Sequence, residues 1–350
     1  MLRIRFTAED LERTTFRPSL GVLGELGFAL RQLHHADRRS PFWAWSLAGR
    51  TRLTGRLRMT PALFPAATGS HAGANGSLEP PVTSTFLDLH ALTDGMAVRE
   101  DPFESIRRCP PWLMKAELAA LNRWVRLPSW SADLGGGDVE PRERLVRELR
   151  TAFPVLLEPH WHALRQHGRG RLEMYASSLM AEGLSAALAR LHPRIRWQPP
   201  YLELHRPYGA TGTFELGGRG LVVAHSVFCW PDPILSASFS DESASPTLIV
   251  PLLTGAAGLA SCLASARSTG PALAGVVGRT RARVLDILDG GGTDGLHTTA
   301  VARRLGISPA SASGHIAALR AAGLVASTRA GYRVYHRLTA LGVAMLNAGT

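Results

Sequence analysis

The sequence predicts an α+β protein, with a mostly helical first region that carries a small antiparallel sheet, followed by a compact module of helices and one hairpin. Apolar residues recur at helical spacing through most of the first region. Between 201 and 253, short runs of branched and apolar residues are separated by glycine and proline. A chain of 350 residues can bury more than one core. We expect two domains, 1–270 and 271–350.

Composition narrows the class of protein. Hydrophobic residues make up 45% of the chain, yet no apolar run reaches the about 18 to 20 residues that cross a bilayer. The first residues, MLRIRFTAEDLERTTF, lack the apolar stretch of a secretion signal. Cys109, Cys229 and Cys262 lie far apart and form no metal-binding pair. We therefore expect a soluble, cytoplasmic protein with reduced cysteines and no membrane contact.

Charge is distributed unevenly along the chain. Residues 271–350 contain nine arginines and three acids, a net charge of +6 out of +11 for the whole chain. Such a concentration is typical of a module that neutralises phosphates. A solvated basic surface remains the alternative on charge alone.

The first region begins with an alternating strand over 2–6, and Thr7 with Asp10 predicts a capped helix start. Further helices are expected over 19–36, 41–50, 103–125, 141–168 and 171–191, and loops or linkers near 66–85 and 128–141, where glycine, serine and proline gather. The runs 201–205, 213–216, 221–230 and 246–253 predict the small antiparallel sheet. An alanine, glycine and serine-rich stretch, 254–270, leads into the second domain.

The second domain is expected to form helices over 272–278, 280–289, 298–305, 309–322 and 339–346, a glycine loop over 290–295 and a hairpin over 324–338. Thr280 and Thr298 are the expected caps of their helices, and Ser308 caps the next one. Gly306 is expected in the left-handed conformation that ends a helix, and Pro309 suits a first helical turn.

The helix that begins at Pro309 has two different faces. Ala312, Ile316 and Leu319 recur at i, i+4 and i+7 and are the expected buried edge, which His315 adjoins. Small and polar residues occupy the rest of its amino-terminal half. A helix that enters the major groove needs such residues, because its backbone must approach the bases closely. The hairpin that follows carries Arg329 and Arg333, placed to reach phosphates or the minor groove.

The stretch TTAVARRLGISPASASGHIAALRAAGLVASTRAGYRVYHRLT resembles the winged helix-turn-helix of ArsR-type transcription regulators. The resemblance covers about 80 residues and includes the capped helices, the tight turn, the glycine stop and the arginine-bearing hairpin. It implies a C-terminal DNA-binding domain that reads double-stranded DNA, usually as a homodimer and usually as a repressor. The first 270 residues resemble the uncharacterised amino-terminal region of long regulators of that group more loosely.

The resemblance implies a set of DNA-binding residues: Ser308, Pro309, Ala310, Ser311, Ser313, Gly314, His315, Arg329 and Arg333. The family often has a polar or histidine side chain where this chain has Gly314, so shape and phosphate contacts are expected to outweigh direct base readout. Its metal-sensing members carry cysteines on the helix before the turn, and TTAVARRL has none. We expect no metal and no cofactor.

Three questions stay open at this level. Aromatic residues of the middle region fill a core or line a pocket for an apolar small-molecule effector: Trp161, Tyr175, Trp197, Tyr201, Phe228 and Trp230. The segments PALAGVVG and TALGVAML contact a second copy or pack within the chain. The second domain binds DNA or, as the alternative, serves as a protein-interaction module without DNA binding.

Catalysis and metal binding have little support in the sequence. None of the catalytic motifs of serine hydrolases, zinc proteases or nucleotide-hydrolysing loops is present. His160 and His162 are two residues apart and cannot share a helix face, and His167 stands about 10 Å further along the axis. The glycine-rich 217–220 precedes a strand and is expected to form a hairpin turn. We expect no enzymatic activity.

Overall fold

The computed structural model describes residues 1–64, 101–122, 126–205, 212–237, 243–253, 262–263, 271–289, 295–330 and 333–348. Contacts divide the chain into two compact units. Unit 1 comprises 1–96 and 102–263, and unit 2 comprises 97–101 and 264–350. Each unit is described by itself below. The linker predicted near 66–85 and the glycine loop at 290–294 lie outside the described residues.

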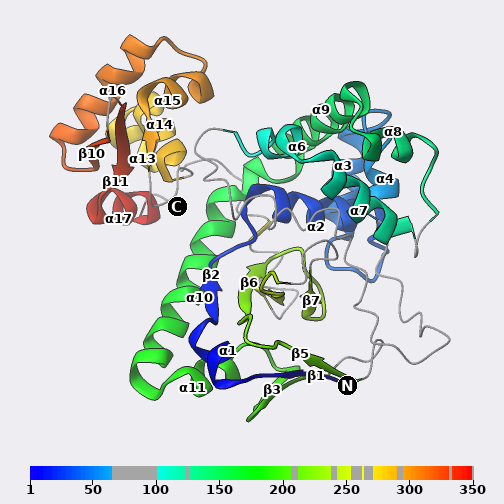
Figure 1. The fold of residues 1–350 in the computed structure, drawn as a ribbon. Helices are drawn as coiled ribbons and strands as arrows, with labels where there is room; N and C mark the ends of the chain where they lie inside the picture. Colours follow the sequence, from blue (N-terminus) through cyan, green and yellow to red (C-terminus); the bar gives the residue numbers. More distant parts are fainter. Residues whose placement is uncertain are drawn as a thin grey trace. The chain divides into compact units, whose positions relative to one another are not determined.

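Most helices of unit 1 gather at one end, and two sheets occupy the other (Figure 1). The helices are α1 (Ala8–Glu12), α2 (Gly21–His35), α3 (Trp43–Arg52), α4 (Thr60–Leu63), α6 (Glu104–Arg108), α7 (Pro111–Asn122), α8 (Trp130–Gly136), α9 (Val139–Leu156), α10 (Trp161–Glu182) and α11 (Leu184–Ala189), with a 3-10 turn, η2, at Glu158–His160. Leucines of α2 and α9 form the centre of the helical core. The capping box predicted for Thr7 and Asp10 is present at α1.

The predicted single antiparallel sheet is wrong. The strands are β1 (Leu2–Arg5), β2 (Thr15–Arg17), β3 (Ile195–Gln198), β4 (Tyr201–Leu204), β5 (Gly212–Glu215), β6 (Val222–Ser226), β7 (Ile234–Ser236) and β8 (Thr247–Pro251). They form two mixed sheets, ordered β3-β4-β1-β5 and β2-β6-β8-β7. The pairs β1–β5, β2–β6 and β6–β8 are parallel. Because the amino-terminal strands β1 and β2 pair with strands about 200 residues later, sequence runs alone could not reveal this topology.

Two predicted boundaries in unit 1 are also wrong. The stretch 128–141, predicted as a linker, contains α8 and the start of α9, and Gly137 closes α8 with φ 95°. The helix break predicted between 168 and 171 lies instead at η2, because α10 runs unbroken through Gly168 and Gly170. α10 lies beside β2 (Figure 1). Gly170 lies within this continuous helix, and a Cβ added there would meet nothing within 4 Å.

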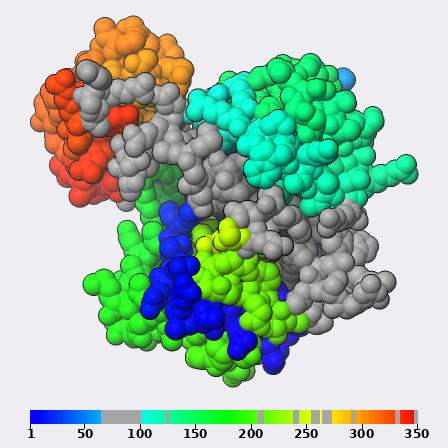
Figure 2. Space-filling view, viewed as in Figure 1, coloured from blue at the N-terminus to red at the C-terminus, as the bar shows by residue number. Residues whose placement is uncertain are grey.

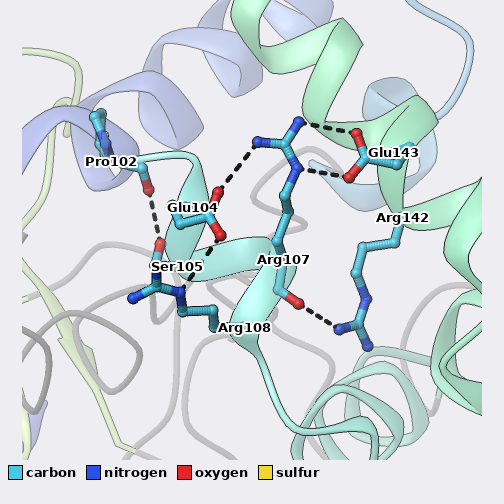
Figure 3. A network of polar contacts seen from close by, with 7 residues as sticks. All are labelled: Pro102, Glu104, Ser105, Arg107, Arg108, Arg142 and Glu143. Atoms are coloured by element: carbon cyan, nitrogen blue, oxygen red, sulfur yellow. Dashed lines mark hydrogen bonds and ion pairs between the residues drawn. The ribbon is translucent and has the colours of Figure 1, made fainter. Parts of the chain in front are cut away.

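An ion-pair network fastens α6 to α9 (Figure 3). Arg107 of α6 donates from Nε and Nη2 to the two carboxylate oxygens of Glu143, at 2.6 and 2.8 Å. Glu104 contacts the same guanidinium at 3.3 Å, and Arg142 of α9 donates to the backbone carbonyl of Arg107 at 2.7 Å. Pairing with Arg107 lowers the pKa of Glu143 below its usual value. The two-oxygen geometry fixes α6 on α9, because a bidentate pair constrains orientation as well as distance.

Five of the six middle-region aromatics pack in or against two separate cores. Trp161, Phe228 and Trp230 belong to the helical core, whereas Tyr175 and Trp197 belong to the core between the sheets. Tyr175 is 2% exposed and stacks on His225 with ring centroids 5.3 Å apart. Their placement supports the packing interpretation and gives no support to an effector pocket among them.

His225 makes the stability of unit 1 depend on pH. Its Nε2 lies 3.0 Å from the hydroxyl of Tyr175, and burial lowers its pKa to about 4. The unfolded chain therefore binds a proton more readily below about pH 6.5. Stability due to neutral His225 is complete above that pH and is lost between about 6.5 and 4, by up to about 1.4 kcal/mol per pH unit.

We expect His225→Gln to remove this contribution to the pH dependence. Urea unfolding of both proteins, followed between neutral pH and pH 4, measures the difference in slope. Equal slopes for the wild type and the variant would show that His225 is not held neutral by burial.

Unit 2 has its own core, and its helices and hairpin follow the predicted order. It contains α13 (Pro271–Val277), α14 (Arg279–Asp289), β9 (Leu296–His297), α15 (Thr298–Leu305), α16 (Pro309–Ala321), β10 (Val325–Ala330), β11 (Arg333–Leu338) and α17 (Ala340–Ala348). Val284, Leu285 and Val301 are fully buried at its centre. The orange-to-red atoms of α16, the hairpin and α17 form one closely packed body (Figure 2).

Candidate nucleic-acid interface

The turn between α15 and α16 is built by three consecutive residues. Gly306 ends α15 with φ 70°, the left-handed conformation predicted for it. Ile307 then packs against the core of the unit. Ser308 caps α16, because its Oγ accepts a hydrogen bond from the backbone N–H of Ser311 at 3.1 Å. Pro309 follows at the first helical position, as predicted. This turn fixes the angle at which α16 leaves the core.

The two faces predicted for α16 are present. Ala312, Ile316 and Leu319 are at most 2% exposed and face the core. The predicted site residues on the opposite side are exposed: Ser308, Pro309, Ala310, Ser311, Ser313 and Gly314. His315 is half-buried at the border between the faces. The structure thus brings the six exposed residues together as one tip, called the α16 tip below.

The α16 tip is narrow and carries no formal charge. A Cβ added at Gly314 would meet nothing within 4 Å, so the backbone there is uncovered. Hydroxyls of Ser311 and Ser313 are the polar groups beside it. A surface of this kind can approach a nucleic acid groove closely and hydrogen-bond with phosphates or base edges.

The hairpin that follows α16 forms a three-stranded sheet, ordered β10-β11-β9, with the strand that precedes α15. β10 and β11 pair antiparallel from Val325–Leu338 to Ala330–Arg333, which confirms the predicted hairpin. Arg329 is exposed on β10. Arg333 begins β11, and its side chain lies outside the described residues. The backbone therefore places both predicted arginines at the far end of the hairpin.

A buried histidine ties the hairpin to α15. His336 of β11 is 7% exposed, with Nδ1 2.8 Å from the hydroxyl of Ser327 on β10 and Nε2 3.0 Å from that of Thr298 on α15. Burial lowers its pKa, and the charge of Arg320 adds to the effect. Because both ring nitrogens contact neighbouring elements, His336 positions the hairpin relative to the first helix of the turn.

Four features of this region differ from the predictions or add to them. His297, not Thr298, caps α15, since its Nδ1 accepts from the N–H of Ala300 at 3.1 Å. Thr280 lies inside α14 and is not its cap. Strand β9 was missed because two residues give no alternation. Arg320, exposed in the last turn of α16, was also left out of the predicted site. Its helical spacing from Ser313 and Ala317 could have indicated it.

The cap at Ser308 provides a direct test of the turn. We expect Ser308→Ala to lower the free energy of unfolding of unit 2 by about 1 kcal/mol, because the N–H of Ser311 loses its acceptor. Ser308→Asp should retain the stability, since a carboxylate accepts the same bond. Thermal unfolding of the three full-length proteins measures the difference. Equal stability of Ser308→Ala and wild type would contradict the capping role.

The comparisons with known proteins agree with this geometry. Residues 279–328 match a family model described as a helix-turn-helix domain. The chain carries a helix-turn-helix domain. The match spans α14, α15, α16 and part of β10, and therefore includes the α16 tip. No curated protein and no solved structure matches the chain. The helix-turn-helix domain is the basis for assigning a DNA-binding regulatory role.

Metal clusters and membrane-spanning helices are absent among the described residues. Within the described residues, no group of three or more His, Cys, Asp or Glu side chains could hold a metal ion. His160 is buried, and burial lowers its pKa. In the part of the chain that the structure covers, no helix has the length and apolarity needed to cross a membrane.

Proposed function

We propose that the protein is a sequence-specific DNA-binding transcription regulator of the ArsR type. In this proposal unit 2 is a winged helix-turn-helix, in which the α16 tip enters the major groove and the β10–β11 hairpin is the wing. Arg329 and Arg333 bind phosphates or reach the minor groove from the wing. The proposal assigns the protein to the cytoplasm and gives it no catalytic step.

One observation carries the proposal. The helix that follows the turn of the matched helix-turn-helix domain leaves its amino-terminal half uncovered within unit 2, with six exposed small or polar residues side by side. A structural helix of the same length would be expected to hide more of such a face or to cover it with long charged side chains. The net charge of +6 over 271–350 adds the electrostatic attraction that duplex binding needs.

The finer parts of the proposal concern assembly and regulation. We propose a homodimer, in which two α16 tips read half-sites about 34 to 36 Å apart. Val276 of α13 and Leu341 of α17 are 73% and 58% exposed and are apolar, which supports a contact there with a second copy. We propose repression as the mode of regulation, and unit 1 as the region that senses an effector or binds a partner. An effector can act only if its affinity differs between DNA-competent and incompetent arrangements.

A mobility-shift experiment with genomic fragments tests the DNA-binding role. We expect the full-length protein to shift a subset of fragments, with an affinity that falls steeply as salt rises. Arg329→Ala with Arg333→Ala should weaken binding at least about tenfold and make the log–log salt slope shallower by about 0.9 for each phosphate contact removed. No shifted fragment at low salt would overturn the proposal in favour of a protein-interaction module.

A further inference from the structure

A second basic segment lies in unit 1, outside the helix-turn-helix domain. Between residues 31 and 58 the sequence contains seven arginines and one acid, Asp37, a net charge of +6. The same net charge is spread over the last 80 residues of the chain. The segment comprises the end of α2, all of α3 and the connection to α4. The net charge per residue is therefore higher in residues 31–58 than in residues 271–350.

Five of these arginines are exposed. Arg38 and Arg39 lie in the α2–α3 connection, Arg52 ends α3, and Arg56 and Arg58 follow it. Among the residues that the structure describes, no acid forms an ion pair with any of their side chains. In contrast, several arginines elsewhere on unit 1 have a carboxylate partner: Arg108 with Glu104, Arg144 and Arg147 with Glu140, and Arg190 with Glu182. These five exposed residues flank the two ends of α3, and we call them the α3 basic surface.

The carboxylates of Asp37 and Glu148, which contact this segment, accept hydrogen bonds from its backbone N–H groups. Asp37 Oδ1 accepts from the N–H groups of Arg39 and Ser40, at 2.8 and 3.0 Å. Glu148 of α9 is 5% exposed and accepts from the N–H groups of Arg58 and Met59 at 2.9 and 3.0 Å. Because these oxygens stabilise the backbone of the segment, they hold the arginines in place without binding their side chains.

The segment that carries the α3 basic surface is packed on the helical core. Phe42 is fully buried and stacks on Phe228 with ring centroids 5.4 Å apart, and Trp45 lies 4.9 Å from the same ring. Arg50 donates from Nη2 to the carbonyl of Ala36 at 3.0 Å, which ties α3 to the end of α2. A fixed backbone lowers the entropy lost when the arginine side chains bind a partner.

We propose that the α3 basic surface binds the phosphate backbone of duplex DNA without reading its sequence. The choice of duplex DNA rests on the proposed function, because a chain with a helix-turn-helix domain is already held near that polyanion. α3 has ten residues and is about 15 Å long, which corresponds to about four phosphates of one strand. Guanidinium groups suit phosphate oxygens, since they donate two parallel hydrogen bonds. The surface thus adds affinity and salt dependence to binding, and the α16 tip adds selectivity.

The test compares four full-length proteins on a mixed-sequence duplex by fluorescence anisotropy over a range of salt. They are wild type, a surface variant (Arg38, Arg39, Arg52 and Arg56→Gln), a wing variant (Arg329 and Arg333→Ala) and a control. The control replaces the four ion-paired arginines Arg108, Arg144, Arg147 and Arg190 by Gln and so has the same net charge as the surface variant. Thermal unfolding checks that every protein is folded.

We expect the surface variant to bind at least about tenfold more weakly at low salt, with a log–log salt slope shallower by up to about 3.6. The control should lose much less, since its arginines already contact carboxylates. If the surface variant binds like wild type while the wing variant does not, this inference fails and the proposed function stands. If the wing variant alone binds like wild type, the proposed role of the wing fails and this inference stands.

Three further outcomes would overturn the inference. Equal losses for the surface variant and the control would mean that net charge, rather than this surface, governs binding. A surface variant that binds duplex normally but no longer binds vesicles of anionic lipid would assign the surface to a membrane. Absence of duplex binding by the wild type would overturn both proposals.

Discussion

Gly314→Glu should abolish sequence-specific DNA binding while making the free protein slightly more stable. A Cβ at this position meets nothing within 4 Å, so the side chain fits without moving its neighbours. Glu is favoured over Gly in an exposed helix interior by about 0.5–1 kcal/mol. In the proposed complex the same carboxylate would face phosphates and base edges. Like charges brought together at an interface cost several kcal/mol, so we expect at least an about 100-fold loss of affinity.

Gly170→Glu is the matched control. Gly170 is also an exposed glycine within a helix, α10 of unit 1, and its added Cβ likewise meets nothing within 4 Å. The substitution adds the same charge and the same helix propensity away from the α16 tip. Fragment affinity measured by mobility shift should fall for Gly314→Glu and stay within about twofold for Gly170→Glu, which is about 0.4 kcal/mol. Equal affinities of both variants would place α16 away from the DNA.

The helix-turn-helix domain could be predicted from sequence because its boundaries have local causes. Gly306 and Pro309 fix helix ends through their backbone preferences, and Ser308 does so through its side-chain cap. Ile316 with Leu319 marks the buried edge. The cap of α15 is an exception with a physical reason. His297 caps α15 with a ring nitrogen, a role more typical of Ser, Thr, Asp or Asn, and the sequence therefore pointed to the neighbouring Thr298.

The fold of unit 1 is harder to predict from the sequence, because its strands pair with partners that are distant in the chain. β1 pairs in parallel with β5, with Leu2 opposite Gly212. The local sequence of either strand does not indicate which strand is its partner. β2 and β7 have three residues each, too few for an alternating pattern. An acid on an amphipathic helix ordinarily faces solvent, yet Glu148 of α9 is buried, where it accepts backbone N–H groups at the start of α4. Only the packed structure reveals that role.

Leu285→Ala should destabilise unit 2 far more than any exposed substitution on the same helix. Leu285 is fully buried in α14, in one core with Val301 and Ile316, so truncation removes apolar contact and leaves a cavity. Leu→Ala changes of this kind cost about 2–5 kcal/mol. Arg283→Gln, at an exposed position of α14, is the control and should stay within about 0.5 kcal/mol.

Hydrogen exchange measured along the chain separates this effect from global unfolding. Because unit 2 has a core of its own, we expect Leu285→Ala to speed the exchange of amides in residues 271–348 and to leave those of α2 and α9 in unit 1 protected. DNA affinity should fall with the folded fraction of unit 2 and recover on cooling toward the temperature of maximum stability, since the α16 tip itself is unchanged. Faster exchange of α2 and α9 by the same factor would mean that the two cores unfold together, and a regulator built from separable units would then be excluded.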